Sequence, residues 1–124
     1  PTLVQPTSTT SAGAWTATGA ASLHAAINEL VPSDTQYISV NSASTTELVL
    51  AESAYPGAAN QTLAYRASST QGSTLTVTLK QGVTTIMTRT HSLTGTDTLY
   101  TQTLTGGEIA LITAGPISVT LTTL

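Results

Sequence analysis

The sequence predicts an all-β fold: a two-sheet antiparallel β-sandwich of the jelly-roll or immunoglobulin-like type, with an extended N-terminal arm and one or two short helical segments. Two observations predict it. Threonine occupies nearly every second position over much of residues 74–124, and apolar residues fill many of the places between. That is the period of a strand with one buried face. About seven or eight such strands, separated by short turn-forming loops, are typical of sandwiches.

The clearest strand pattern lies at residues 74–80. Leu75, Val77 and Leu79 alternate there with two threonines and a lysine, and residues 117–122 repeat the pattern. Threonine suits an outer sheet face because its branched side chain fits the pleat, while its hydroxyl can bond to water or to a neighbouring protein. We therefore expect an apolar inner face and a threonine-rich outer face.

Residues 1–14 hold two prolines, a Ser/Thr run and no charge. This composition predicts an extended arm without a strand pattern of its own, ahead of a β-sandwich domain at residues 15–124. An arm of this kind becomes ordered by lying against a partner. Leu3 and Val4 are its expected anchors.

A short helix is predicted between residues 19 and 30. Leu23, Ile27 and Leu30 recur there at helical spacing, and Thr18 is available as the N-cap. Apolar residues also alternate within this segment, so an extended strand remains an alternative.

The remaining elements follow from turn residues and alternation. A hairpin turn is predicted at Gln81-Gly82, with glycine in the second turn position. A single helical turn within residues 106–112 is predicted to cross between the sheets. The predicted strands are 36–40, 47–51, 62–67, 74–80, 83–90, 99–105 and 117–122.

Composition excludes several function classes. Only 7% of the 124 residues are charged, against about 25% in ordinary domains, and the net charge is −3. So few cations cannot neutralise many phosphates, which argues against nucleic-acid binding. Weak charge repulsion favours association, so we expect a homo-oligomer. Without cysteine there are no disulfides, and no apolar run approaches the roughly 18 residues of a membrane span.

Catalytic and metal motifs are missing from the sequence, so we expect no enzyme, no cofactor and no metal site. His24 and His91 lie in no metal-binding spacing, and we expect them to be solvated or interface residues. A triad of His91, Asp97 and a nearby serine can be assembled on paper, but no nucleophile elbow supports it. The acidic residues are spread along the chain and form no calcium motif.

Five aromatic residues offer an alternative as a sugar-stacking platform. Four of them lie in or beside strand patterns, where an aromatic side chain is most often part of the core. Trp15 differs because it stands where the arm meets the domain, and we expect it to plug the open end of the sandwich. Tyr55 lies in a loop and is a weaker candidate for contact.

The order of several short motifs resembles that in a family of tailed-bacteriophage virion proteins, over roughly residues 15–124. The resemblance implies a β-sandwich that coats or extends a virion, as a capsid decoration (cement) protein or as a tail or fibre module. The arm and the lack of additional domains favour clasping a shell. The motifs are Trp15, Asn28-Glu29, Pro32-Ser33-Asp34, Tyr37-Ile38, residues 63–67, residues 75–79, Gln81-Gly82, and a C-terminal part from Tyr100-Thr101 through Glu108-Ile109 to Val119-Thr120-Leu121.

From these features we expect a decoration protein that binds the major capsid protein on the outer head surface and stabilises the shell. It would be made in the host cytoplasm, since no signal peptide is recognisable in the sequence. The expected contact residues are Leu3, Val4, Trp15 and Tyr55. Two alternatives remain: a carbohydrate-binding module on the head or a tail fibre that binds host glycans, and a tail-tube or baseplate subunit.

Overall fold

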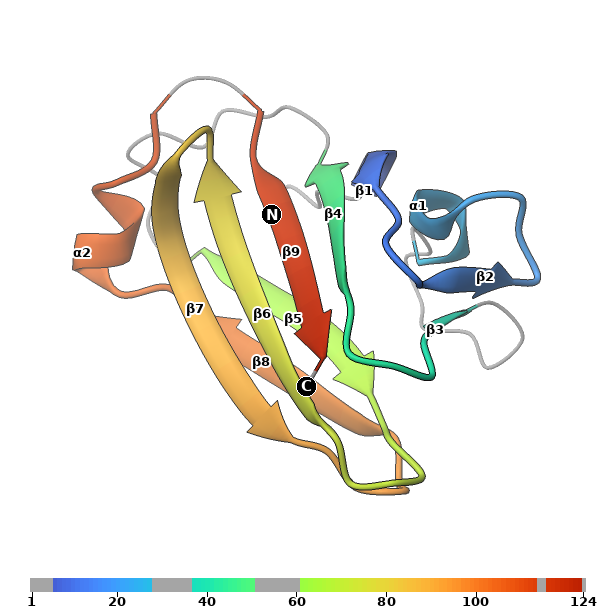
Figure 1. Cartoon of the computed structure of the whole chain (residues 1–124). Helices are drawn as coiled ribbons and strands as arrows, with labels where there is room; N and C mark the ends of the chain where they lie inside the picture. Colours follow the sequence, from blue (N-terminus) through green and yellow to red (C-terminus); the bar gives the residue numbers. More distant parts are fainter. Residues whose placement is uncertain (1–5, 28–36, 51–60, 114–115, 124) are drawn as a thin grey trace.

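The structure, a computed structural model, describes residues 6–27, 37–50, 61–113 and 116–123, and it confirms the all-β prediction. Antiparallel sheets pack against one another, and the two helices are single turns (Figure 1). Neither helix in the described ranges is long and apolar enough to cross a membrane. The elements are β1 (Pro6–Ser11), β2 (Thr16–Thr18), α1 (Leu23–Ala26), β3 (Tyr37–Ser39), β4 (Thr45–Leu50), β5 (Thr62–Ala67), β6 (Thr74–Gln81), β7 (Thr84–Ser92), β8 (Thr98–Thr103), α2 (Gly106–Ile109) and β9 (Ser118–Thr123).

The largest sheet has five antiparallel strands in the order β1-β4-β9-β6-β7. Leu75, Val77 and Leu79 on β6 all face inward and are at most 5% exposed. On the neighbouring β9, Val119 pairs with Leu79, and Leu121 pairs with Val77. Directly paired residues share a face of the sheet, so these apolar side chains form one continuous inner surface. The predicted register of 74–80 is thus confirmed.

Two small sheets cover the inner surface. The β5–β8 sheet lies behind β6, β7 and β9 in Figure 1, and partly buried Leu63 and Tyr65 of β5 pack against the core. The β2–β3 sheet and α1 lie at the other end, beside β1 and β4. Leu23 of α1 is buried there, and Ile38 of β3 packs against the same core. The core therefore extends across the five-stranded sheet, from the side of β1 to the side of β7.

The β6–β7 hairpin is confirmed, but its turn lies one residue later than predicted. Gln81 and Thr84 form the last pair, so Gly82 and Val83 make the two-residue loop. Gly82 holds the first loop position with φ of +61°. A positive φ at that position is what the primed hairpin turns, types I′ and II′, require, and glycine adopts it without steric cost.

A β-bulge interrupts β7 just after this turn. Leu79 pairs with Met87, whereas the next residue of β6, Lys80, pairs with Thr85. Ile86 is therefore the extra residue, and both Ile86 and Met87 are buried. Strict alternation cannot bury two consecutive residues, so the bulge explains why the pattern of β7 is harder to interpret than that of β6.

Residues 6–11 of the predicted extended arm carry no strand pattern in the sequence, yet they form a strand of the main sheet. They form β1, which pairs with β4 at the edge of the five-stranded sheet, with two register shifts. β1 has no apolar side chain apart from Pro6, which is why alternation did not identify it. Its support is polar: the hydroxyl of fully buried Thr46 donates to the Ser11 carbonyl at 2.6 Å.

The turn after β1 is docked on β4. Gly13 has φ of +57°, and a Cβ at this position would collide with the Thr45 carbonyl oxygen. The Ala14 amide donates to the Ser44 hydroxyl at 2.7 Å. Only glycine permits this backbone conformation and this close approach together.

The helix predicted within residues 19–30 is shorter and begins later than expected. It is the single turn α1, with Ser22 as its N-cap, whereas Thr18 is the last residue of β2. Leu23 and Ala26 are buried, and Leu30 lies outside the described residues. Residues 16–18, before α1, are extended because they form β2 and pair with β3. This tertiary pairing outweighs the helix propensity of the segment.

The second helical turn agrees with the prediction. α2 follows β8 and leads to β9, so it does cross between two sheets. Thr105 is its N-cap: its hydroxyl accepts from the Glu108 amide, while the Glu108 carboxylate accepts from the Thr105 amide. This reciprocal capping box satisfies two amides that a short helix would otherwise leave free.

Candidate functional site

The outer side of β4, β9, β6 and β7, which we call the threonine face, is a polar surface of the five-stranded sheet. None of the other described elements lies over it in Figure 1. Cross-strand pairing arranges its side chains in rows that run across the strands, and we call these rows ranks. The ranks are Thr45, Thr122, Thr76 and Thr90, then Glu47, Thr120, Thr78 and Thr88, then Val49, Ser118, Lys80 and Thr85.

Hydroxyl pairs run across this face. Thr45 and Thr122 Oγ1 atoms lie 3.0 Å apart, and those of Thr76 and Thr90 lie 3.3 Å apart. The Thr120 hydroxyl, in the middle rank, is buried by its neighbours and has no hydrogen-bond partner. The ranks carry one acid, one lysine and no aromatic residue. The threonine face can therefore offer neutral hydrogen bonds and methyl groups, and it can offer little charge or ring stacking.

A second polar feature lies between the layers, at the edge of the sandwich. In the β6–β7 register, Arg89 pairs with Val77 and His91 pairs with Leu75. Paired residues share a face, so both basic side chains point to the core side, toward the β5–β8 sheet.

His91 meets two tyrosines there, and we call these three residues the interlayer cluster. The imidazole stacks on Tyr100 with ring centroids 3.9 Å apart, and its Nε2 is hydrogen-bonded to the Tyr65 hydroxyl. Tyr65 and Tyr100 are themselves a cross-strand pair of β5 and β8. His91 is partly buried and bonded to Tyr65, so solvent is not its only partner.

Burial sets the protonation states of this cluster. It lowers the pKa of His91, because a charged imidazole loses solvation there. Burial also raises the pKa of Tyr65 to about 12, opposed by the positive charge of Arg89 and assisted by Tyr100. The Tyr65 hydroxyl thus keeps its proton and can donate to the neutral imidazole.

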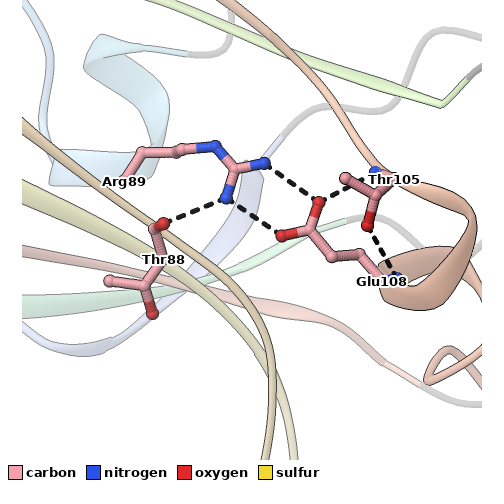
Figure 2. Close-up of polar contacts among 4 residues, drawn as sticks. All are labelled: Thr88, Arg89, Thr105 and Glu108. Carbon is pink, nitrogen blue, oxygen red and sulfur yellow. Dashed lines mark hydrogen bonds and ion pairs between the residues drawn. The ribbon is translucent and has the colours of Figure 1, made fainter.

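Arg89 joins β7 to α2, as Figure 2 shows. Its guanidinium forms two parallel hydrogen bonds of 2.9 Å to the Glu108 carboxylate. The same carboxylate caps α2 through the Thr105 amide at 2.9 Å. The bonds from Arg89 are the main reason that the pKa of Glu108 is lowered. This geometry is that of a structural clamp, since every oxygen of the carboxylate is already occupied.

Trp15, the one predicted contact residue within the described ranges, is half-buried and packs against the core. Its indole nitrogen donates to the Ser44 carbonyl at 3.4 Å. It also lines a shallow hollow between β1, β2 and α1 whose other walls are mostly alanine and threonine. Leu3, Val4 and Tyr55, the other predicted contacts, lie outside the described residues.

The aromatic residues do not form one platform in the described chain. Tyr65 and Tyr100 are partly buried and tilted by 32°, while Trp15 lies with β1 and β2. Tyr37 is exposed, on β3. The coplanar, exposed surface that would favour sugar stacking is therefore not present among these residues.

The geometry of the described residues supports neither a catalytic triad nor a metal site. His91 bonds to Tyr65, and not to Asp97 or a serine, in the part of the chain that the structure describes. Within the same ranges, no three His, Asp or Glu side chains gather where they could hold a metal ion.

The interlayer cluster and the Arg89–Glu108 clamp were not predicted from the sequence. One signal could have identified them: counting forward along β7 from the hairpin turn, with one bulged residue, places Arg89 and His91 on the buried face. Comparisons with family models, with curated proteins and with solved structures found no match for this chain.

Proposed function

We propose that this protein is a structural component of a tailed-bacteriophage virion, a capsid decoration protein that binds the major capsid protein on the outer head surface as a homo-oligomer. The observation that carries the proposal is the threonine face, an ordered neutral surface left uncovered by the rest of the described chain. The resemblance over residues 15–124 supports the same class.

The chemistry of this face favours a protein partner. Interface cores are poor in charge, and the threonine face carries only Glu47 and Lys80 in its three ranks. Its hydroxyls can bond to another protein's backbone, and its methyl groups can be buried at little cost. Many copies on one shell would turn weak single contacts into firm attachment.

The remaining contacts are assigned to Leu3, Val4, Trp15 and Tyr55, as the sequence predicts. Residues 6–11 form β1, which pairs with β4 at the edge of the five-stranded sheet. Trp15 borders the hollow beside that edge. An apolar side chain of the partner would fit against the indole there.

The first experiment places a charge on the threonine face. Thr90 is exposed and ends the first rank, so Thr90→Arg should leave the fold intact while putting a bulky cation into the contact. We expect at least a tenfold loss in cosedimentation with particles stripped of the protein. Thr101→Arg is the matched control, because Thr101 is exposed on the β5–β8 sheet. Equal binding by both variants would contradict the assignment of the face.

The second experiment varies salt. The chain has three Lys and Arg residues in all, and Arg89 is paired with Glu108. Charge cannot then be the main source of adhesion. Retention on particles should change little between low salt and about 1 M NaCl, where the screening length is about 3 Å. Steep release with added salt would refute this mechanism, and binding to tails or to glycan arrays in place of heads would favour the alternatives.

A further inference from the structure

We propose that His91 is an acid-sensitive latch between the two layers of the sandwich. In its neutral form it holds the β5–β8 sheet against β6 and β7, and its protonation loosens that sheet from the rest of the fold. The inference concerns the free chain and does not depend on the proposed function.

The β5–β8 sheet has few apolar contacts with which to hold its place. Its strands contribute four partly buried residues that pack against the core: Leu63, Tyr65, Ala67 and Tyr100. None of the four is fully buried. Two of them, the tyrosines, are the partners of His91. One titratable side chain thus contacts two of these four residues.

Neutral His91 makes two contacts that cross the layers. Its Nε2 is hydrogen-bonded to the Tyr65 hydroxyl of β5, and its ring stacks on Tyr100 of β8. The hydroxyl is a permanent donor throughout the range where imidazole titrates, because the pKa of Tyr65 is raised to about 12. When Nε2 carries no proton, the imidazole accepts from this hydroxyl.

Protonation of His91 turns Nε2 into a donor, so the Tyr65 hydroxyl must turn to accept from it, and it places a charge in the partly buried gap. Three other groups face it: Arg89, two residues along β7 on the same side, and the two tyrosines. Arg89 repels an imidazolium, although its bond to Glu108 of α2 moderates the repulsion. The Tyr100 ring face attracts a cation. The loss of solvation opposes the charged form and is the largest effect, so the pKa of His91 is lowered.

The direction of the pH effect follows from linkage. In an opened state, His91 returns to water and titrates near its ordinary value of about 6.5. The closed state takes up a proton only at lower pH. Between these two values the opened state binds more protons, so the closed state is favoured above about pH 6.5 and loses stability as the pH falls.

The test is native-state hydrogen exchange on the full chain between pH 7.5 and 5.0, corrected for intrinsic exchange rates. We expect the opening equilibrium of β5 and β8 amides to rise severalfold as the pH falls, because protonation favours the opened state. Amides of β6 and β9, at the centre of the other sheet, should change much less. The imidazole resonance of His91 should titrate below about 6.5 in the same samples.

Variants assign the effect to His91. His91→Phe keeps an aromatic ring against Tyr100 and cannot be protonated, so exchange at β5 and β8 should become independent of pH. His91→Gln serves the same purpose if the phenylalanine variant does not fold. His24→Gln is the matched control: His24 contacts Thr9 of β1 and belongs to α1, and its replacement should leave the pH response intact.

Three results would overturn the proposal. The first is unchanged protection of β5 and β8 across this pH range in the native chain. The second is an equal pH response in His91→Phe or His91→Gln. The third is an equal loss of protection at β6 and β9, which would indicate global unfolding.

Discussion

Strands β6 and β7 are neighbours in one hairpin, yet they build their inner faces differently. β6 alternates without interruption, and its inward residues Leu75, Val77 and Leu79 are all apolar and buried. β7 starts with a bulge that buries Ile86 and Met87 together.

Further along β7, the inward positions are polar. Arg89 and His91 lie directly opposite Val77 and Leu75. They are accommodated because β7 is an edge strand, where the Glu108 carboxylate and the two tyrosines can reach them. A central strand must bury its inward face in other apolar groups, whereas an edge strand can satisfy polar groups from the side.

The largest expected effect tests the inner face of β6. Val77 is fully buried at the centre of the five-stranded sheet, so Val77→Asp should leave an unpaired charge there and cost on the order of 4 kcal/mol. Thr78→Asp, on the other side of the same strand, should cost much less. Thermal melts compare the two variants, and the opposite order would mean that the register is shifted by one residue.

The next effect tests the bulge of β7. Ile86 is 3% exposed, so Ile86→Ala should destabilise the protein by about 2–4 kcal/mol through the cavity it leaves. Strict alternation from Met87 would place Ile86 outside, where truncation costs about 0.5 kcal/mol or less. Urea denaturation separates the two cases. Thr85→Ala, at the preceding exposed position, is the control.

A smaller effect is expected for the clamp at the edge of β7. Glu108→Gln should cost about 1 kcal/mol at pH 7, since the ion pair is partly exposed. Because Arg89 lowers the pKa of Glu108, the carboxylate takes up its proton at a lower pH in the native state than in the unfolded chain. The stabilisation is present above the unfolded pKa of about 4.3 and is lost as the pH falls through the folded value.

Denaturation of the native chain and of Glu108→Gln at pH 6 and pH 3 measures this loss. The difference in stability between the two proteins should be largest at pH 6 and shrink as the pH falls toward 3. A constant difference would show that the clamp does not depend on the carboxylate charge. Glu47→Gln on the threonine face is a control for the loss of an acid elsewhere.

The smallest effect belongs to the outer side of β7. Thr88 is exposed on the threonine face, and Thr88→Val keeps the shape of the side chain and its strand preference. The free energy of unfolding of the free protein should change by no more than about 0.5 kcal/mol. Loss of particle binding without loss of stability would support a role of this face in binding. A large destabilisation would show that the hydroxyl is needed for the fold.

The local sequence pattern was sufficient to predict the structure of a segment where that structure depends on the segment's own residues. β5 begins and ends where alternation predicted it, and the hairpin of β6 and β7 and the turn α2 lie close to their predicted places. The threonine face also follows from the sequence, since Thr76, Thr78 and Thr120 alternate with apolar neighbours. Apolar alternation and turn residues predict these elements because strand period and turn geometry depend on residues that are close together in the sequence.

Tertiary structure decided the rest. The polar segment Pro6–Ser11 became β1 only because β4 offers a free edge to its backbone, and backbone pairing has no side-chain signature. Pairing between strands distant in sequence set the ranks of the threonine face. The inward placement of Arg89 and His91 depends on a bulge and on partners from β5, β8 and α2. Alternation shows that a strand has two faces, but burial of a charged side chain is tolerated only where distant segments bring it a partner.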